Sequence, residues 1–138
     1  MSRGVKPLDV LMGEWVTTSK TYPEGRGRTA VTLTEDGKFV RIDSSVEDDR
    51  FPHSTLLVGA DDSRDECTVL YYDSRGVYRV YLMSVTGDEW RMWRDAPGFN
   101  QRYIGTIKDG GSTIEGQWEM SEDGTNWHVD FDLTYRKK

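Results

Sequence analysis

Cysteine and long apolar runs are scarce in this 138-residue sequence and an excess of positive charge is absent, and each of these features argues against a class of protein. The single cysteine, Cys67, excludes an intramolecular disulfide framework and a zinc site built from several cysteines. No apolar run approaches the roughly 18 residues that span a bilayer, so we expect no membrane partner. Lys and Arg number 18 against 24 Asp and Glu, and this acidic balance argues against nucleic acid as a partner.

Signatures of common catalytic and cofactor sites are scarce as well. The glycines stand singly or in turn pairs, without the strand–loop–helix setting in which they bind phosphate. The two histidines, His53 and His128, lie 75 residues apart, and this spacing does not match that of a metal-binding motif. The acidic segments do not match the spacing of a calcium loop, and no nucleophile elbow marks a serine hydrolase. We therefore expect no metal and no cofactor.

The length fits one domain over residues 1–138, with a core of ordinary size. The first seven residues carry charges with no apolar stretch behind them, which argues against a secretory signal. Together with the single cysteine, this composition is typical of a cytoplasmic globular protein.

Aromatic residues are what the sequence does have, because 5 Trp, 7 Tyr and 4 Phe make up 12% of the chain. Such residues suit the pleated, half-buried surface of a sheet. Turn signals recur about every ten residues. They divide the chain into ten candidate strands: 14–21, 27–34, 38–46, 54–60, 67–72, 77–85, 89–94, 101–107, 112–119 and 127–136.

Only residues 7–13 suit a short helical turn, with Pro7 near its start and Gly13 at its end. No segment between the strands is long enough for a parallel crossover, so the strands should pair antiparallel with their neighbours. The sequence therefore predicts an all-β protein, a single antiparallel up-and-down β-barrel of about ten strands with a short N-terminal helical turn. A two-sheet sandwich is the alternative, although a barrel hides its edges better.

The opening Gly13-Glu14-Trp15 resembles the Gly-x-Trp start of the calycin superfamily, which includes lipocalins and fatty-acid-binding proteins. The second half is more similar to a group of uncharacterised bacterial calycin-like proteins. It shares with them the stretches at residues 91–94, 98–102, 116–119 and 123–127. The resemblance implies a barrel in which Trp15 packs under a basic residue of the last strand, and Arg136 is the matching candidate.

Two departures from better-known calycins leave the ligand open. Fatty-acid-binding proteins end with an Arg-x-Tyr that holds a carboxylate, whereas this chain has Tyr135-Arg136 in the reverse order. The heme-binding nitrobindins carry a histidine near the C-terminus, where His128 stands here, but their glycine-rich opening motif is missing. The resemblance therefore implies the fold and names no ligand.

The last predicted strand alternates between apolar and polar residues, so Phe131, Leu133 and Tyr135 should face inward together with Val129. His128 and Asp130 should then face solvent. Carrying the pairing backward through the hairpins, whose loop lengths set the register, brings several arginines to the same inner face. The residues expected to line the cavity are Arg79, Tyr81, Met83, Trp90, Met92, Arg94, Arg102, Trp118 and Phe131.

An arginine cluster inside a barrel needs acidic partners, water or an anionic ligand, because an unpaired buried charge is costly. An aromatic cavity with such a cluster favours an amphipathic anion, for instance a carboxylate on an apolar body. A one-residue bulge would instead turn some of these arginines outward. Glu66, Asp73 or Glu89 could also neutralise them, and the aromatic side chains could fill the barrel as packed core.

These observations favour a binding barrel, monomeric or homodimeric, for a small hydrophobic, amphipathic or aromatic ligand. Two other functions stay open at this point. A small isomerase or cyclase would use Tyr72 or Tyr81 as acid or base. A heme-binding barrel would use His128 or His53 as axial ligand.

Overall fold

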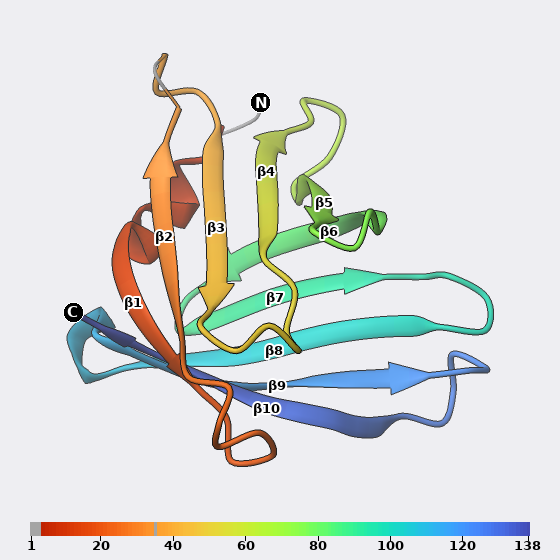
Figure 1. The fold of residues 1–138 in the computed structure, drawn as a ribbon. Coiled ribbons are helices and arrows are strands. Elements are labelled where there is room, and N and C mark those ends of the chain that lie inside the picture. Colours follow the sequence, from red (N-terminus) through yellow and green to blue (C-terminus); the bar gives the residue numbers. More distant parts are fainter. Residues whose placement is uncertain (1–3, 35) are drawn as a thin grey trace.

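Ten antiparallel strands follow one another around a closed barrel in the computed structural model, which describes residues 4–34 and 36–138 (Figure 1). The first and last strands pair with each other, so the ring is complete. The strands are β1 (Gly13–Thr18), β2 (Gly27–Leu33), β3 (Val40–Val46), β4 (Ser54–Ala60), β5 (Cys67–Asp73), β6 (Tyr78–Thr86), β7 (Glu89–Arg94), β8 (Asn100–Lys108), β9 (Thr113–Ser121) and β10 (His128–Lys137). This architecture confirms the predicted barrel, and the sandwich alternative is wrong.

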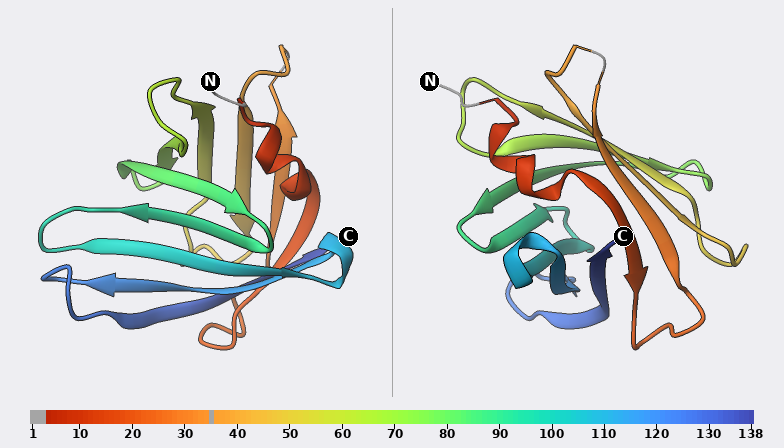
Figure 2. Two further views of the ribbon diagram at one scale, coloured as in Figure 1. Left: turned by 180° about the vertical axis from the view of Figure 1, so that it is seen from behind. Right: turned by 90° about the vertical axis from the view of Figure 1, so that its left-hand side faces the viewer.

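The expected helical turn is a 3₁₀ helix, η1 (Lys6–Leu11), which lies across the barrel against β6 (Figure 2). Proline stands near its start, where a missing N–H costs no hydrogen bond. Leu8 and Leu11 are each 1% exposed and join the core, and Trp15 Nε1 donates to the Leu11 carbonyl at 2.9 Å. The turn therefore seals one end of the barrel. None of the helical segments in the described residues has the length and hydropathy needed to cross a bilayer.

The predicted inward position of Arg102 requires Met92 to pair with Ile104 and Arg94 with Arg102, and the register between β7 and β8 differs from this by one residue. Met92 pairs with Tyr103 and Arg94 with Gln101, so Tyr103 faces inward and Arg102 outward. The cause lies in Asn100 at the start of β8. Its Oδ1 accepts a hydrogen bond from the Ala96 N–H at 2.8 Å, and its Nδ2 donates to the Ser121 carbonyl at 3.1 Å. These bonds hold the β7–β8 loop in the conformation that sets the start of β8.

A second one-residue difference, between β8 and β9, compensates for the first. Tyr103 rather than Arg102 pairs with Trp118, so Trp118 still faces inward as predicted. The outcome is that β8 presents the face opposite to the expected one, while β7 and β9 keep theirs. Its inner residues are Gln101, Tyr103, Gly105 and Ile107, all of them buried.

The final strand carries a bulge that the alternation pattern did not reveal. Val129 pairs with Glu119 and Phe131 with Trp118, which leaves Asp130 as an extra residue between two consecutive partners. Val129 is therefore 54% exposed, and Asp130 borders the barrel interior. The expected faces of these two residues are wrong, whereas Phe131, Leu133 and Tyr135 line the interior as predicted.

Candidate ligand-binding cavity

A cavity of about 460 Å³ occupies the barrel interior, and each of the ten strands contributes to its lining. It extends to the end of the barrel opposite η1. We call that end the mouth, because loop residues Tyr22, Phe51, Arg75 and Phe99 border the cavity there. The cavity is therefore open toward the loops and blocked at the other end.

The cavity wall is mainly aromatic. Trp90 lies between Tyr103 and Tyr135, with ring centroids 5.2 and 5.3 Å apart. Trp118 continues the cluster, 5.6 Å from Tyr103 and 6.0 Å from Tyr81. These edge-to-face and tilted contacts hold the rings in place and leave apolar surface for a ligand body.

Neutral hydroxyl groups give this wall its polarity. Burial raises the pKa of Tyr103 and of Tyr135 far above the ordinary value, so both phenols stay protonated at any physiological pH. The Tyr103 hydroxyl donates to the Leu133 carbonyl at 3.1 Å. The indole Nε1 of Trp90 is buried and has no hydrogen-bond partner among the described residues.

A positively charged group lies where the aromatic wall meets the mouth. The Tyr81 hydroxyl donates to Gln101 Oε1 at 2.7 Å. Burial raises the pKa of this hydroxyl, and the nearby guanidinium groups of Arg79 and Arg94 act in the opposite direction. The Arg79 guanidinium lies 5.3 Å from the Phe99 ring centroid, and that of Arg94 lies 6.0 Å from the Tyr81 ring centroid. In the described part of the chain, neither arginine forms an ion pair with a carboxylate.

Another arginine, Arg75, lies at the mouth and is neutralised by Asp73. The Arg75 guanidinium donates to Asp73 Oδ2 at 2.6 Å, and the Tyr71 hydroxyl donates to the same oxygen at 2.6 Å. Hydrogen bonds from Arg75 hold the Asp73 pKa well below its usual range, although burial acts against them. Sequence reasoning missed Arg75, and Asp73, named as a neutralising partner, pairs with it rather than with the predicted arginines.

Most of the residues predicted to line the cavity do so: Arg79, Tyr81, Trp90, Met92, Trp118 and Phe131. Met83 is fully buried below the cavity, opposite Cys67. Arg94 lies beside Tyr81, outside the lining itself. Arg102 is placed differently from the prediction, because on the outer face it stacks 4.0 Å from the Trp127 ring centroid and binds Glu119 at 2.5 Å.

The basic residue over Trp15 is Lys137 rather than Arg136. Lys137 Nζ lies 5.1 Å from the Trp15 ring centroid, and the two residues pair across β1 and β10. Arg136 faces outward, and its guanidinium donates to Thr18 Oγ1 at 3.1 Å. The alternation that turns Tyr135 inward requires this outward position, so the predicted Trp15–Arg136 contact is wrong.

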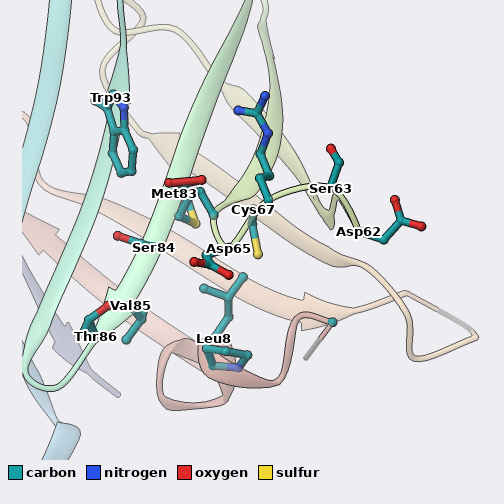
Figure 3. A pocket seen from close by; sticks show the side chains of 14 residues that line it. Leu8, Asp62, Ser63, Asp65, Cys67, Met83, Ser84, Val85, Thr86 and Trp93 are labelled. Atoms are coloured by element: carbon teal, nitrogen blue, oxygen red, sulfur yellow. The ribbon is translucent and has the colours of Figure 1, made fainter. Parts of the chain in front are cut away.

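A separate depression of about 410 Å³ lies near η1 and shares no lining residue with the cavity (Figure 3). Leu8, Cys67 and Met83 border it together with the acidic β4–β5 loop. Burial raises the pKa of the Cys67 thiol, which disfavours a reactive thiolate. No group of three or more potential metal ligands comes together within the described residues.

The residues named for the two other functions lie mostly outside the cavity. His53 and His128 are exposed and do not border it, so neither is placed to bind a heme iron there. Tyr72 is 39% exposed, on a strand position that faces away from the interior. Of the four, only Tyr81 lies at the cavity.

No protein-family model matches the chain, and a search of curated proteins returned no match either. The geometry of the cavity is therefore what bears on function.

Proposed function

We propose that this protein is a small-molecule-binding barrel of the calycin type, whose ligand is an amphipathic anion with an apolar or aromatic body. One observation carries the proposal: an aromatic cavity of about 460 Å³ has an arginine at its margin, Arg79, with no carboxylate partner among the described residues. A volume of this size falls in the range of roughly 300–1,000 Å³ that is usual for small-molecule sites. A cytoplasmic and bacterial setting, expected from the sequence, belongs to the same proposal.

The guanidinium of Arg79, which has no ion-pair partner among the described residues, supports an anion rather than a cation or a neutral molecule. An arginine at a partly desolvated site without a counter-charge is unfavourable by itself, and an anionic group would satisfy it. Its planar donors suit a carboxylate, sulfonate or phosphate oxygen pair. The phenols of Tyr103 and Tyr135, held neutral by burial, add no negative charge that would repel such a ligand.

Two fluorescent probes that differ by one sulfonate test the proposal. N-phenylnaphthylamine (NPN) has the apolar body alone, and anilinonaphthalene sulfonate (ANS) adds the anion. We expect both to bind with enhanced fluorescence and ANS to bind more tightly. Arg79→Gln should weaken ANS about fivefold or more and leave NPN within about twofold, because a charge-assisted bond is lost.

Arg64→Gln provides the matched control, since it removes the same charge at the depression near η1. It should leave the affinity for both probes unchanged. The proposal fails if neither probe binds, or if Arg64→Gln weakens ANS as much as Arg79→Gln does. Native mass spectrometry of the freshly purified protein would then show whether any small molecule co-purifies.

A further inference from the structure

The barrel wall has a gap between β6 and β7 close to the mouth. Pairing between these strands extends from Thr86–Glu89 to Leu82–Trp93 and stops there. Residues 78–81 of β6 continue to pair with β5, and Arg94 of β7 continues to pair with β8. The two strands, neighbours in Figure 1, therefore lack mutual hydrogen bonds over the first part of β6, residues 78–81.

A groove of about 500 Å³ occupies this gap on the outside of the barrel. Arg79 and Tyr81 line both the groove and the central cavity, so these two side chains form the partition between the spaces. Arg94 and Asp95 line the groove and not the cavity. The half-buried Arg79 side chain therefore lies at the junction of the two spaces.

The charges differ between the gap and the main mouth. At the gap, the two arginines Arg79 and Arg94 outnumber the one acidic residue of the groove, Asp95, and neither arginine forms an ion pair in the part of the chain that the structure describes. At the mouth, Arg75 is paired with Asp73, and Asp130 adds a negative charge to the cavity margin. The positive potential that attracts an anion is therefore concentrated at the gap.

We infer that the anionic group of the ligand lies in the gap between β6 and β7, held by the guanidinium groups of Arg79 and Arg94, with its apolar body in the cavity. The inference rests on the proposed binding function and specifies its ligand further. Because the outer side of the groove faces solvent, the anionic group can carry an additional polar substituent. The expected ligand class is thus an amphipathic acid or its phosphodiester- or sulfonate-type conjugate, rather than an acid enclosed on all sides.

Two acidic residues, one at each opening, allow the position of the anion to be measured. Asp95→Asn removes a negative charge beside the gap, and Asp130→Asn removes the same charge at the main mouth. At low ionic strength we expect Asp95→Asn to raise ANS affinity about two- to threefold and Asp130→Asn to give a smaller rise, since the effect of a charge falls with distance. Arg94→Gln should lower ANS affinity about threefold or more, and NPN binding should stay within about twofold in all three variants.

The inference is overturned if Asp130→Asn raises ANS affinity as much as Asp95→Asn or more, or if Arg94→Gln leaves it unchanged. These results would place the anion at the mouth while NPN still bound, so the binding function itself would stand. Failure of NPN to bind the unmodified protein would instead contradict the binding function. Circular dichroism and urea unfolding of each variant separate a changed site from a changed fold.

Discussion

The ring of Tyr103 lies directly over Gly116, in space that any side chain at position 116 would occupy. A Cβ atom there would come within 2.6 Å of the Tyr103 hydroxyl oxygen and within 2.5 Å of the Ile104 carbonyl oxygen. Gly105 is the cross-strand partner of Gly116, and a Cβ on it would also meet the Tyr103 ring, at 2.8 Å. The two facing glycines therefore make the room in which the central aromatic ring of the cavity lies.

Gly116→Ala should lower the free energy of unfolding by about 1–3 kcal/mol, because neither the Ile104 backbone nor the enclosed Tyr103 ring can move away. Urea unfolding followed by tryptophan fluorescence measures the loss. Gly59→Ala is the control, since its Cβ would meet only the ring of the exposed Phe39, at 3.2 Å. That variant should be as stable as the parent or slightly more so. Equal losses in both variants would contradict the explanation.

Asp132 pins the β1–β2 loop, and its removal should make the protein less sensitive to acid. Its carboxylate accepts hydrogen bonds of 2.8–2.9 Å from the Ser19 hydroxyl, the Lys20 N–H, and both the N–H and hydroxyl of Thr21. Partial burial opposes ionisation, but these bonds outweigh it and hold the Asp132 pKa below the ordinary value of 3.8. The stabilisation is therefore fully present above pH about 4 and is lost as the pH falls below that value.

Asp132→Asn should cost about 1–2 kcal/mol at neutral pH, since an amide cannot accept all of these bonds. The difference from the parent should shrink as the pH is lowered from about 5 to 2, because Asp132 of the parent is protonated in the unfolded chain at a higher pH than in the folded protein. Thermal unfolding across this pH range measures both effects. Asp130→Asn, two residues earlier on the same strand, should give a far smaller loss. A constant difference at every pH would rule out the linkage.

Arg102 should matter for stability and not for ligand binding. It lies on the outer face, where its guanidinium stacks 4.0 Å from the Trp127 ring centroid and its ion pair with Glu119 is only partly exposed. Arg102→Gln should lower the free energy of unfolding by about 1 kcal/mol while ANS and NPN affinities stay unchanged. Arg41→Gln, which breaks a more exposed pair with Asp43, should cost much less, because solvent screens that pair. Weaker ANS binding in Arg102→Gln would show that the inward placement expected from the sequence was right.

Asp73 should control the ionisation of Tyr71. Burial and the hydrogen bond to Asp73 together raise the pKa of Tyr71 to about 12. Asp73→Asn removes the negative charge but not the burial, so the Tyr71 pKa should fall part of the way back toward 10.0. Ultraviolet titration, with Tyr71→Phe subtracted to identify the residue, measures the shift. The same substitution should destabilise the protein by about 1–3 kcal/mol, because the buried Asp73 carboxylate accepts hydrogen bonds from Tyr71 and Arg75 that an amide cannot all accept.

The strands could be predicted from the sequence because the signals that end them are local. Glycines such as Gly87 and Gly124 adopt the positive φ that their turns require, and each lies where a turn was expected. The pairing of β7 with β8 could not be predicted in the same way. It depends on Asn100, whose side chain donates a hydrogen bond to the carbonyl of Ser121, 21 residues later in the sequence. A local sequence pattern cannot predict such a bond. An error of one residue in the predicted register was enough to assign Arg102 to the inner face instead of the outer face.

The candidate site was predictable to the extent that it depends on alternation within strands. Arg79 and Tyr81 were expected on the inner side of β6, and both border the cavity. The exchange of Lys137 for Arg136 over Trp15 was also predictable, since the inward Tyr135 already required it. The gap between β6 and β7 could not be predicted in this way, because it arises where the pairing of two strands of different length ends.

The bulge in β10 consists of one residue, Asp130, which also supplies the acidic group at the mouth. Val129 and Phe131 already pair with consecutive residues, Glu119 and Trp118, so the ladder would be regular if Asp130 were absent. Deleting this one residue would remove a negative charge from the entrance without turning any other side chain to the opposite face. Deletion of one residue could thus change the charge of the mouth, and with it the selection of ligands, while the aromatic lining of the cavity stays the same.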